Sequence, residues 1–294
     1  MGTARQILVG LAATLAGAAC VQPATADPAA WQVTGKSGGE LRLLGSMHEL
    51  RASDYPLPAS VDDLYASADA LVMEIDLDDL DAGAEQAALL HAGLLPQGKS
   101  LKDVIAAPLY ARTDREAQAL GVDIALLDRF EPWMAAVSLL ELGTRRVGFE
   151  AERGVEQYLV RKARTDHKEV IGLETVEFQL GLFDQLSNHD QQALLEQTVR
   201  ELDSAGETLD RLARAWRQGE LDTAAKELLG EFDGFPELYT KLVKDRNARW
   251  VPTLERLLGD GRRYLVVVGA LHLVGDDSVV ALLAEQGFAV TRLP

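Results

Sequence analysis

Two apolar runs in the sequence, LRLLGSMH and YLVVVGALH, end in the same G-x-x-H pattern and present His48 and His272 just after residues of buried type. Two further runs, ALVMEID and KEVIGLE, carry Glu74 and Glu174 near their ends. Imidazole and carboxylate groups transfer protons and bind divalent metal ions. These side chains are therefore the first candidates for acid–base or metal-assisted chemistry.

The residue types leave two chemistries open. Two histidines with carboxylates suit a divalent ion such as Mn, Co or Zn, which lowers the pKa of a bound water. The sequence has no HExxH or CxxC spacing, so a metal-free reaction with a histidine as the base is the alternative. The remaining histidines stand in polar turns or at predicted helix ends, and we interpret them as solvated: His91, His167 and His189.

An arginine lies on the apolar face of a helix predicted over 236–258. Val243 and Trp250 flank Arg246 at helical spacing, and an arginine among buried side chains needs a carboxylate or an anionic ligand. We expect one of the two strand-end glutamates to be that partner. The alternative is that the Arg246 side chain extends along the edge of the apolar face and places its guanidinium in solvent. Asn247 follows directly and can present its amide to the same place.

The elements that must position these residues alternate between strands and helices, which predicts an α/β fold with a central sheet. Short apolar runs predict strands over 41–48, 70–76, 168–174, 264–272 and 288–293. Helical spacing is found over 60–68, 81–92, 101–120, 132–143, 153–165, 175–186, 189–218, 221–230, 236–258 and 276–286. A large helical layer is thus expected between the third and fourth main strands. If the strands are parallel, their carboxyl ends meet at one crevice.

The acidic charge balance excludes some classes of partner. The chain has 294 residues with 29 Lys and Arg against 46 Asp and Glu, a formal net charge of −17. Nucleic acids and anionic membrane surfaces need clustered cations, so neither is expected as the main partner.

The first residues resemble a secretory signal. An apolar, small-residue stretch is followed by ATA before Asp27, so we expect a signal peptide over 1–26 and a single domain over 27–294. The protein is then exported, either periplasmic or secreted, with no stable membrane span. A lipid anchor on Cys20, in the lipobox-like GAAC, is the alternative.

Seven segments, in this order, resemble the TraB/GumN family, whose relatives include the Tiki-type membrane proteases: GSMH, LVMEID, RFEPWMAA, GFEAERGVEQYL, VIGLETVEFQLGLFDQLS, KDRNARW and VVVGALHLVGDDSVVALLAEQGFAVTRL. The resemblance covers residues 31–293. It implies a compact α/β fold in which two related halves bring both G-x-x-H motifs to one site. It also implies a proposed metal-dependent hydrolase, in the Tiki relatives a peptidase that uses Mn or Co.

When the family's motifs are matched to this sequence, the resemblance implies two overlapping sets of site residues. The metal ligands are His48, His272 and Glu174, and the catalytic or supporting residues are Glu74, Glu174, Arg246 and Asn247. Two departures stand out: GSMH replaces the commoner GTIH, and Glu156 stands where an Asp is expected, which leaves the role of that carboxylate open.

Three functions fit these observations. The first is an exported metal-dependent hydrolase, most simply a peptidase, with a glutamate as general base on metal-bound water. The second is a metal-independent hydrolase with a histidine as the base, as in the erythromycin esterases that this family resembles more distantly. The third is a protein that binds a peptide or glycan without turning it over. No segment identifies the substrate or the oligomeric state.

Overall fold

A six-stranded mixed sheet organises the structure, a computed structural model that describes residues 27–77, 82–221, 229–230, 232 and 235–294. The strand order is β4-β3-β5-β2-β1-β6. The strands are β1 (Ala30–Thr34), β2 (Glu40–Ser46), β3 (Ala70–Ile75), β4 (Glu169–Glu174), β5 (Arg263–Gly269) and β6 (Ala289–Arg292).

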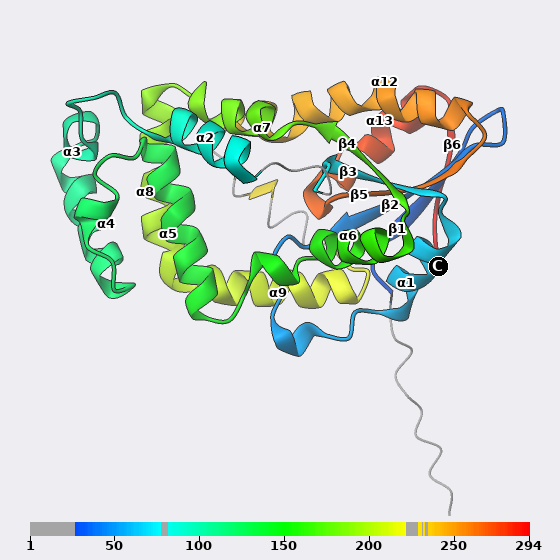
Figure 1. Cartoon of the computed structure of the whole chain (residues 1–294), viewed down its shortest axis with the longest axis horizontal. Helices are drawn as coiled ribbons and strands as arrows, with labels where there is room; N and C mark the ends of the chain where they lie inside the picture. Colours follow the sequence, from blue (N-terminus) through cyan, green and yellow to red (C-terminus); the bar gives the residue numbers. More distant parts are fainter. Residues whose placement is uncertain (1–26, 78–81, 222–228, 231, 233–234) are drawn as a thin grey trace, which may run out of the picture.

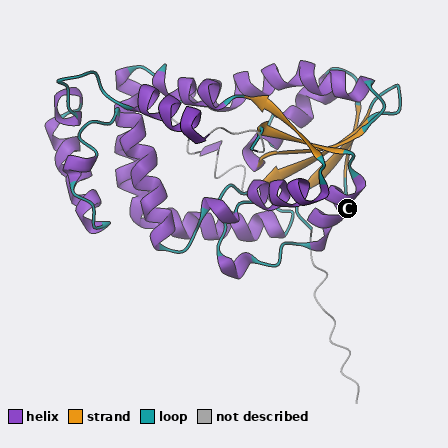
Figure 2. Ribbon diagram, viewed as in Figure 1, coloured by secondary structure: helices purple, strands orange, loops and turns teal. Residues whose placement is uncertain are grey.

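The direction of the strands decides where a site can form. Strands β2, β5, β3 and β4 are mutually parallel, whereas β1 is antiparallel to both β2 and β6. The condition set by the sequence is therefore met: the four strands that precede the site residues are parallel, and their carboxyl ends lie along one edge of the sheet (Figure 2). The two central strands β3 and β5 are buried along most of their length on both faces, which explains why they read as continuous apolar runs, whereas the edge strand β4 is only partly buried.

The helices follow the predicted ranges with some breaks. They are α1 (Ala59–Ser67), α2 (Ala82–Gly93), α3 (Leu101–Val104), α4 (Ala107–Ala119), α5 (Pro132–Arg146), α6 (Val155–Asp166), α7 (Val176–Asp184), α8 (Asn188–Glu201), α9 (Ala205–Arg217), α11 (Pro236–Tyr239), α12 (Asp245–Gly259) and α13 (Val279–Glu285). A proline at the start of α4 separates it from α3, so the helix predicted over 101–120 is two helices. The helix predicted over 221–230 lies largely outside the described residues.

Two layers of helices sandwich the sheet, and a third group extends beyond its carboxyl edge. Helices α12 and α13 cover one face, and α1 and α6 cover the other (Figure 1). Helices α5, α7, α8 and α9 lie beyond the ends of the parallel strands, with α3 and α4 farthest from the sheet (Figure 1). As predicted, a large helical layer falls between the third and fourth main strands, which are β4 and β5.

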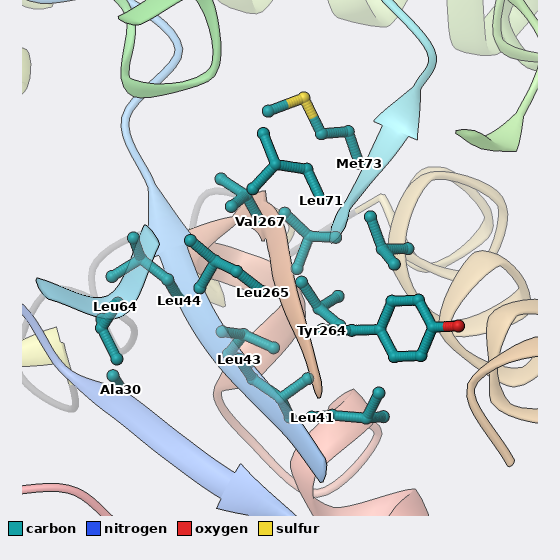
Figure 3. Packing of buried hydrophobic residues seen from close by; sticks show 14 of the residues in the cluster. Ala30, Leu41, Leu43, Leu44, Leu64, Leu71, Met73, Tyr264, Leu265 and Val267 are labelled. Carbon is teal, nitrogen blue, oxygen red and sulfur yellow. The ribbon is translucent and has the colours of Figure 1, made fainter. Parts of the chain in front are cut away.

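The hydrophobic core is gathered in two clusters. The larger one centres on the sheet, where Leu43, Leu71 and Val267 are fully buried between the helical layers (Figure 3). The smaller one joins α4, α5 and α8 around Leu139 and Leu195. The sheet cluster holds the strand ends rigid, whereas the helical cluster builds the wall that faces them. Among the described residues, no helix combines the length and apolar character needed to cross a bilayer.

Candidate functional site

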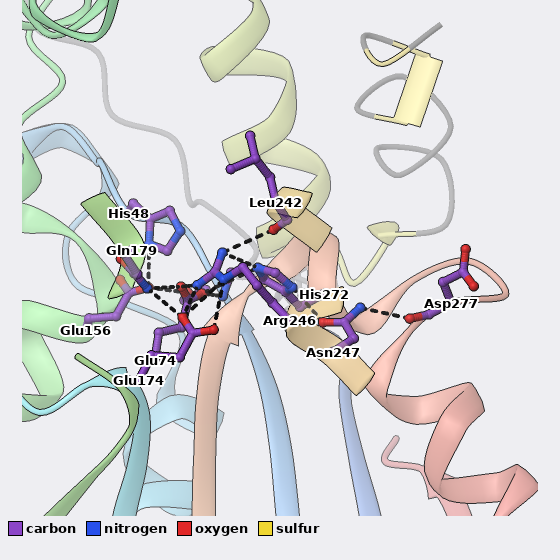
Figure 4. Close-up of polar contacts among 12 residues, drawn as sticks. His48, Glu74, Glu156, Glu174, Gln179, Leu242, Arg246, Asn247, His272 and Asp277 are labelled. Carbon is purple, nitrogen blue, oxygen red and sulfur yellow. Dashed lines mark hydrogen bonds and ion pairs between the residues drawn. The ribbon is translucent and has the colours of Figure 1, made fainter. Parts of the chain in front are cut away.

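The predicted site residues meet at the carboxyl edge of the parallel strands. His48 lies two residues after β2, Glu74 near the end of β3, and Glu174 at the end of β4. His272 follows β5 inside a short 3-10 helix, η6 (Ala270–Leu273), because the strand predicted over 264–272 ends at its glycine. Figure 4 shows these side chains gathered above the strand ends, as the convergence of the parallel strands predicts.

Arg246 is the centre of this cluster. Its side chain comes from α12 and its Nη2 lies 2.6 Å from Glu74 Oε2 and 2.8 Å from Glu174 Oε2. Its Nε also donates to Glu174, at 3.1 Å, which makes that pair bidentate. The residue is only 8% exposed. The prediction of a buried Arg246 paired with a strand-end glutamate is therefore confirmed, and it pairs with both.

The two glutamates are held by further donors. Gln179 on α7 donates to Oε2 of Glu74 at 3.2 Å and to Oε2 of Glu174 at 3.1 Å. The backbone N–H of Gly269 donates to Glu74 Oε1 at 2.8 Å. Burial alone would raise the pKa of Glu74, but the neighbouring His48, His272 and Arg246 and this backbone hydrogen bond lower it to about 2. Glu74 is thus a fixed negative charge rather than a proton carrier at neutral pH.

His272 is buried, and both of its ring nitrogens have hydrogen-bond partners. Asn247 donates from Nδ2 to the Asp277 carbonyl, so its Oδ1 faces His272 Nδ1 at 2.7 Å and fixes the proton on that nitrogen. The other nitrogen, Nε2, then accepts from Nη1 of Arg246 at 3.2 Å. The ring also packs on Trp250, with centroids 4.5 Å apart. Burial lowers the pKa of His272 to about 3, so the ring is neutral.

His48, from the other G-x-x-H motif, is open to solvent. Its Nδ1 lies 2.7 Å from Oε1 of Glu156, and 63% of its side chain is exposed. Glu156 also accepts a hydrogen bond from the hydroxyl of Ser46. The Glu156 carboxylate raises the pKa of His48 from 6.5 to about 10. Burial would raise the pKa of Glu156, but the charge and hydrogen bond of His48 lower it instead.

Glu156 is the functional candidate whose role sequence reasoning left open. It lies in the first turn of α6, far along the chain from His48, and only the motif GVEQYL drew attention to it. The backbone brings the two together closely, because a Cβ on Gly154 would lie 2.2 Å from the His48 carbonyl oxygen. Glycine is therefore required there by the close approach of the chains.

Gly269 keeps a space open between His48 and Glu74. A Cβ at this position would lie 2.9 Å from His48 Nε2 and 3.4 Å from Glu74 Oε1. The free ring nitrogen of His48 and the carboxylate thus face the same small volume beside Gly269. The two G-x-x-H motifs therefore form a common site, as the sequence predicted.

The donor set around Arg246 does not fit a metal ion. Within the described ranges, no three His, Cys, Asp or Glu side chains are grouped so that they could hold one. The Nε2 lone pair of His272, which a metal would need, accepts a hydrogen bond from Arg246, and Glu174 is engaged by the same guanidinium. The guanidinium is therefore the cation that these side chains bind. The metal-binding roles expected for His48, His272 and Glu174 stay predictions.

A cavity of about 840 Å³ opens above the cluster. The floor consists of residues 46–49 and 269–272 together with Arg246. The walls come from α5, α7, α8 and α9 and from Phe232, Phe235, Leu238, Leu242 and Val243. This volume falls in the range of about 300–1,000 Å³ typical of small-molecule sites. Among the site residues, His48 and His272 both line the cavity, but only His48 has a largely exposed side chain.

The fold and the site define an α/β protein with paired G-x-x-H motifs at a charged cavity floor. The profile of the TraB/PrgY/gumN family matches residues 29–292, and the chain belongs to that family. This match confirms the resemblance found in the sequence.

Three relatives illustrate the range of the family. The chain is 28% identical to the uncharacterized protein YbaP of Escherichia coli (strain K12), over 82% of this chain and 86% of YbaP. It is 23% identical to an uncharacterized protein of Treponema pallidum (strain Nichols), over 87% and 80% of the two chains. A metalloprotease TIKI homolog of Amphimedon queenslandica is 36% identical over 25% of this chain and 15% of its own. No solved structure matches the chain significantly.

Proposed function

We propose that the protein is a hydrolase that cleaves an ester or amide bond of a small substrate bound in the cavity, with His48 as the base. The observation that carries this proposal is the contact between His48 and Glu156: one ring nitrogen is anchored by a carboxylate, and the other faces open space beside Glu74. A base oriented in this way can take a proton from an attacking water.

The role of Glu156 is to orient the ring and to stabilise the imidazolium that forms when His48 takes the proton. The same carboxylate raises the pKa of His48, so only the deprotonated fraction is active at neutral pH. The buried Arg246, held by two glutamates, acts as a fixed positive charge at the cavity floor. Because the two carboxylates offset this charge, Arg246 holds the floor residues in place and is not a free cation for an anionic group.

The test is hydrolysis of p-nitrophenyl acetate by purified protein in the presence of a chelator. We expect measurable turnover by the wild type and a loss of about 10²–10⁴-fold in His48→Gln, the usual contribution of a general base. His189→Gln is the matched control, because His189 is exposed and contacts only the neighbouring Asp190 among the described polar groups. Equal rates for His48→Gln and the wild type would refute the proposed base.

A second candidate is a metal-dependent peptidase, which is favoured by the similarity to a protein named as a metalloprotease. His48, His272 and Glu174 would be the ligands for Mn, Co or Zn. For His272 Nε2 and Glu174 to bind a metal, Arg246 would have to leave both. Because the described donors do not fit a metal in this arrangement, the histidine-based reaction is the better supported of the two.

We also propose that the protein is exported, as the sequence of residues 1–26 indicates, although those residues lie outside the described part. The intact mass of the exported protein distinguishes a chain cleaved before Asp27 from a lipoprotein anchored at Cys20. Cleavage before Asp27 gives a chain without modification, whereas retention of Cys20 with acyl chains would identify a lipoprotein.

A further inference from the structure

The cavity lining combines large apolar side chains with a smaller set of polar ones. Large apolar side chains line the cavity from α7, α9 and the segment around α11, including Leu182, Phe183, Leu209, Phe235 and Leu242. These five are only partly buried, although more than half of the leucines that the structure describes are buried in its core. Apolar surface left open inside a concave site gains stability when an apolar ligand covers it.

The polar part of the described lining carries no Lys or Arg that is free of a carboxylate partner. It comes from the end of α8 and the start of α9, where Gln197, Thr198, Glu201 and Thr208 line the cavity. Among the described lining residues, Arg246 is the sole Lys or Arg, and two glutamates already bind it. The protonated His48 is likewise paired with Glu156, so an anionic ligand finds no cation without a carboxylate partner among the described lining residues, which favours an uncharged ligand.

The walls also disfavour an extended peptide. They are built from helices, whose backbone N–H and C=O groups are bonded within each helix. A peptide backbone would enter without a strand edge to pair with, and its unpaired polar groups would lose their contacts with water. An acyl chain has no such groups.

We propose that the substrate is an uncharged ester of a medium-chain acyl group, with the acyl chain along the wall formed by Leu182, Leu209 and Leu242 and the ester carbonyl near His48. This inference rests on the proposed hydrolase function and specifies its substrate class. The hydroxyl groups of the lining residues Thr198 and Thr208 are then available to hydrogen-bond the alcohol part of the ester.

The experiment compares p-nitrophenyl acetate, butyrate and octanoate. Each added methylene of the acyl chain removes apolar surface from water when it is buried, so we expect kcat/KM to rise at least about tenfold from acetate to octanoate. Leu209→Asp should lower the octanoate-to-acetate ratio at least about tenfold. Leu182→Trp, which keeps the wall apolar but narrows the cavity, should move the preference towards shorter chains. The matched control is Leu126→Asp, at a leucine 68% exposed and outside the cavity lining, which should keep the wild-type ratio.

The outcomes separate this inference from the function on which it rests. Hydrolysis of all three esters without a chain-length preference, or faster cleavage of a peptide p-nitroanilide, would overturn the acyl-chain inference and leave the hydrolase standing. If no ester is hydrolysed, the proposed function fails, and binding then decides the inference. A rise in Tm with 2-decanone but not with acetone would support the acyl-chain site, and no rise with either would overturn it.

Discussion

The ring of His48 lies with Nδ1 2.7 Å from Glu156 Oε1, and this contact gives the residue a different role from that of His272. Both histidines follow the same G-x-x-H pattern and lie at the same edge of the sheet. His272 has both nitrogens occupied, by Asn247 and Arg246, and its neutral ring is buried. One motif therefore presents an accessible imidazole to the cavity, whereas the histidine of the other is buried among the residues that hold Arg246.

The pH dependence of the reaction follows from the contact between His48 and Glu156. Three charged groups face His48, namely Glu156, Glu74 and Arg246, and the first raises its pKa to about 10. A raised pKa keeps the ring protonated at lower pH, so the active base appears as the pH rises. We expect kcat/KM to increase with pH up to about 10 and then level off. In Glu156→Gln, the rise should move to lower pH, towards the ordinary value of about 6.5.

The control for this shift is Glu152→Gln, because Glu152 is largely exposed and precedes the same helix. Its pH profile should match that of the wild type. A profile that falls through the alkaline range, or one that Glu156→Gln leaves in place, would show that neutral His48 is not the base.

Gly269 offers a steric test of the common site. An added methyl group would lie 2.9 Å from His48 Nε2, closer than ordinary contacts allow, so Gly269→Ala should displace the ring. Because displacements of about 1 Å can cost about 10²-fold, we expect a rate loss of that order. The exposed ring can move into the cavity, so Tm should change little. Gly259→Ala is the matched control, because a methyl group there meets nothing within 4 Å. Unchanged activity in Gly269→Ala would place the reaction elsewhere.

Stability should depend on Arg246. Arg246→Ala leaves Glu74 and Glu174 buried without their cation, and breaking a buried pair typically costs about 3–5 kcal/mol. The control is Arg112→Ala, which breaks an exposed pair with Glu196 and should cost no more than about 1 kcal/mol. Denaturant unfolding measures the free energy of unfolding of both variants. Equal free energies of unfolding for Arg246→Ala and the wild type would show that the ion pairs of Arg246 with Glu74 and Glu174 do not stabilise the fold.

The sequence predicted much of the fold because the parallel strands are short, apolar and bounded by clear turns. It missed β1, where AWQVT is brief and alternates buried and more exposed residues, and its pairing with β2 and β6 is decided by tertiary contacts. It also extended the last long strand to His272, although the backbone turns into a 3-10 helix after Gly269. Local pattern carries no information on where a buried strand bends around its neighbours.

The site was predicted in part for a similar reason. Strand-end positions and the apolar face of a helix identified His48, His272 and Arg246, because these features are local. The contact of His48 with Glu156 joins two segments that are distant in the sequence, and the bond of Arg246 to His272 Nε2 depends on the packing of α12 against the sheet edge. Whether a histidine side chain is exposed or buried depends on that packing. The shared G-x-x-H pattern alone therefore could not show which of the two histidines is exposed.

The final prediction concerns metal binding. A divalent ion at His272 Nε2 would have to displace Arg246, and the guanidinium would lose its bonds to Glu74 and Glu174 as well. Both the buried arginine and the ligands would then need new partners, which makes binding costly. We therefore expect purified wild-type protein to retain less than one Mn, Co or Zn per chain after dialysis, and chelator to leave ester hydrolysis unchanged. Metal content by elemental analysis is the measurement, with His272→Ala and His189→Ala as the variant and its control. One tightly held ion per chain that His272→Ala loses and His189→Ala keeps would show instead that Arg246 yields its place to a metal, and the metal-dependent peptidase would become the better account.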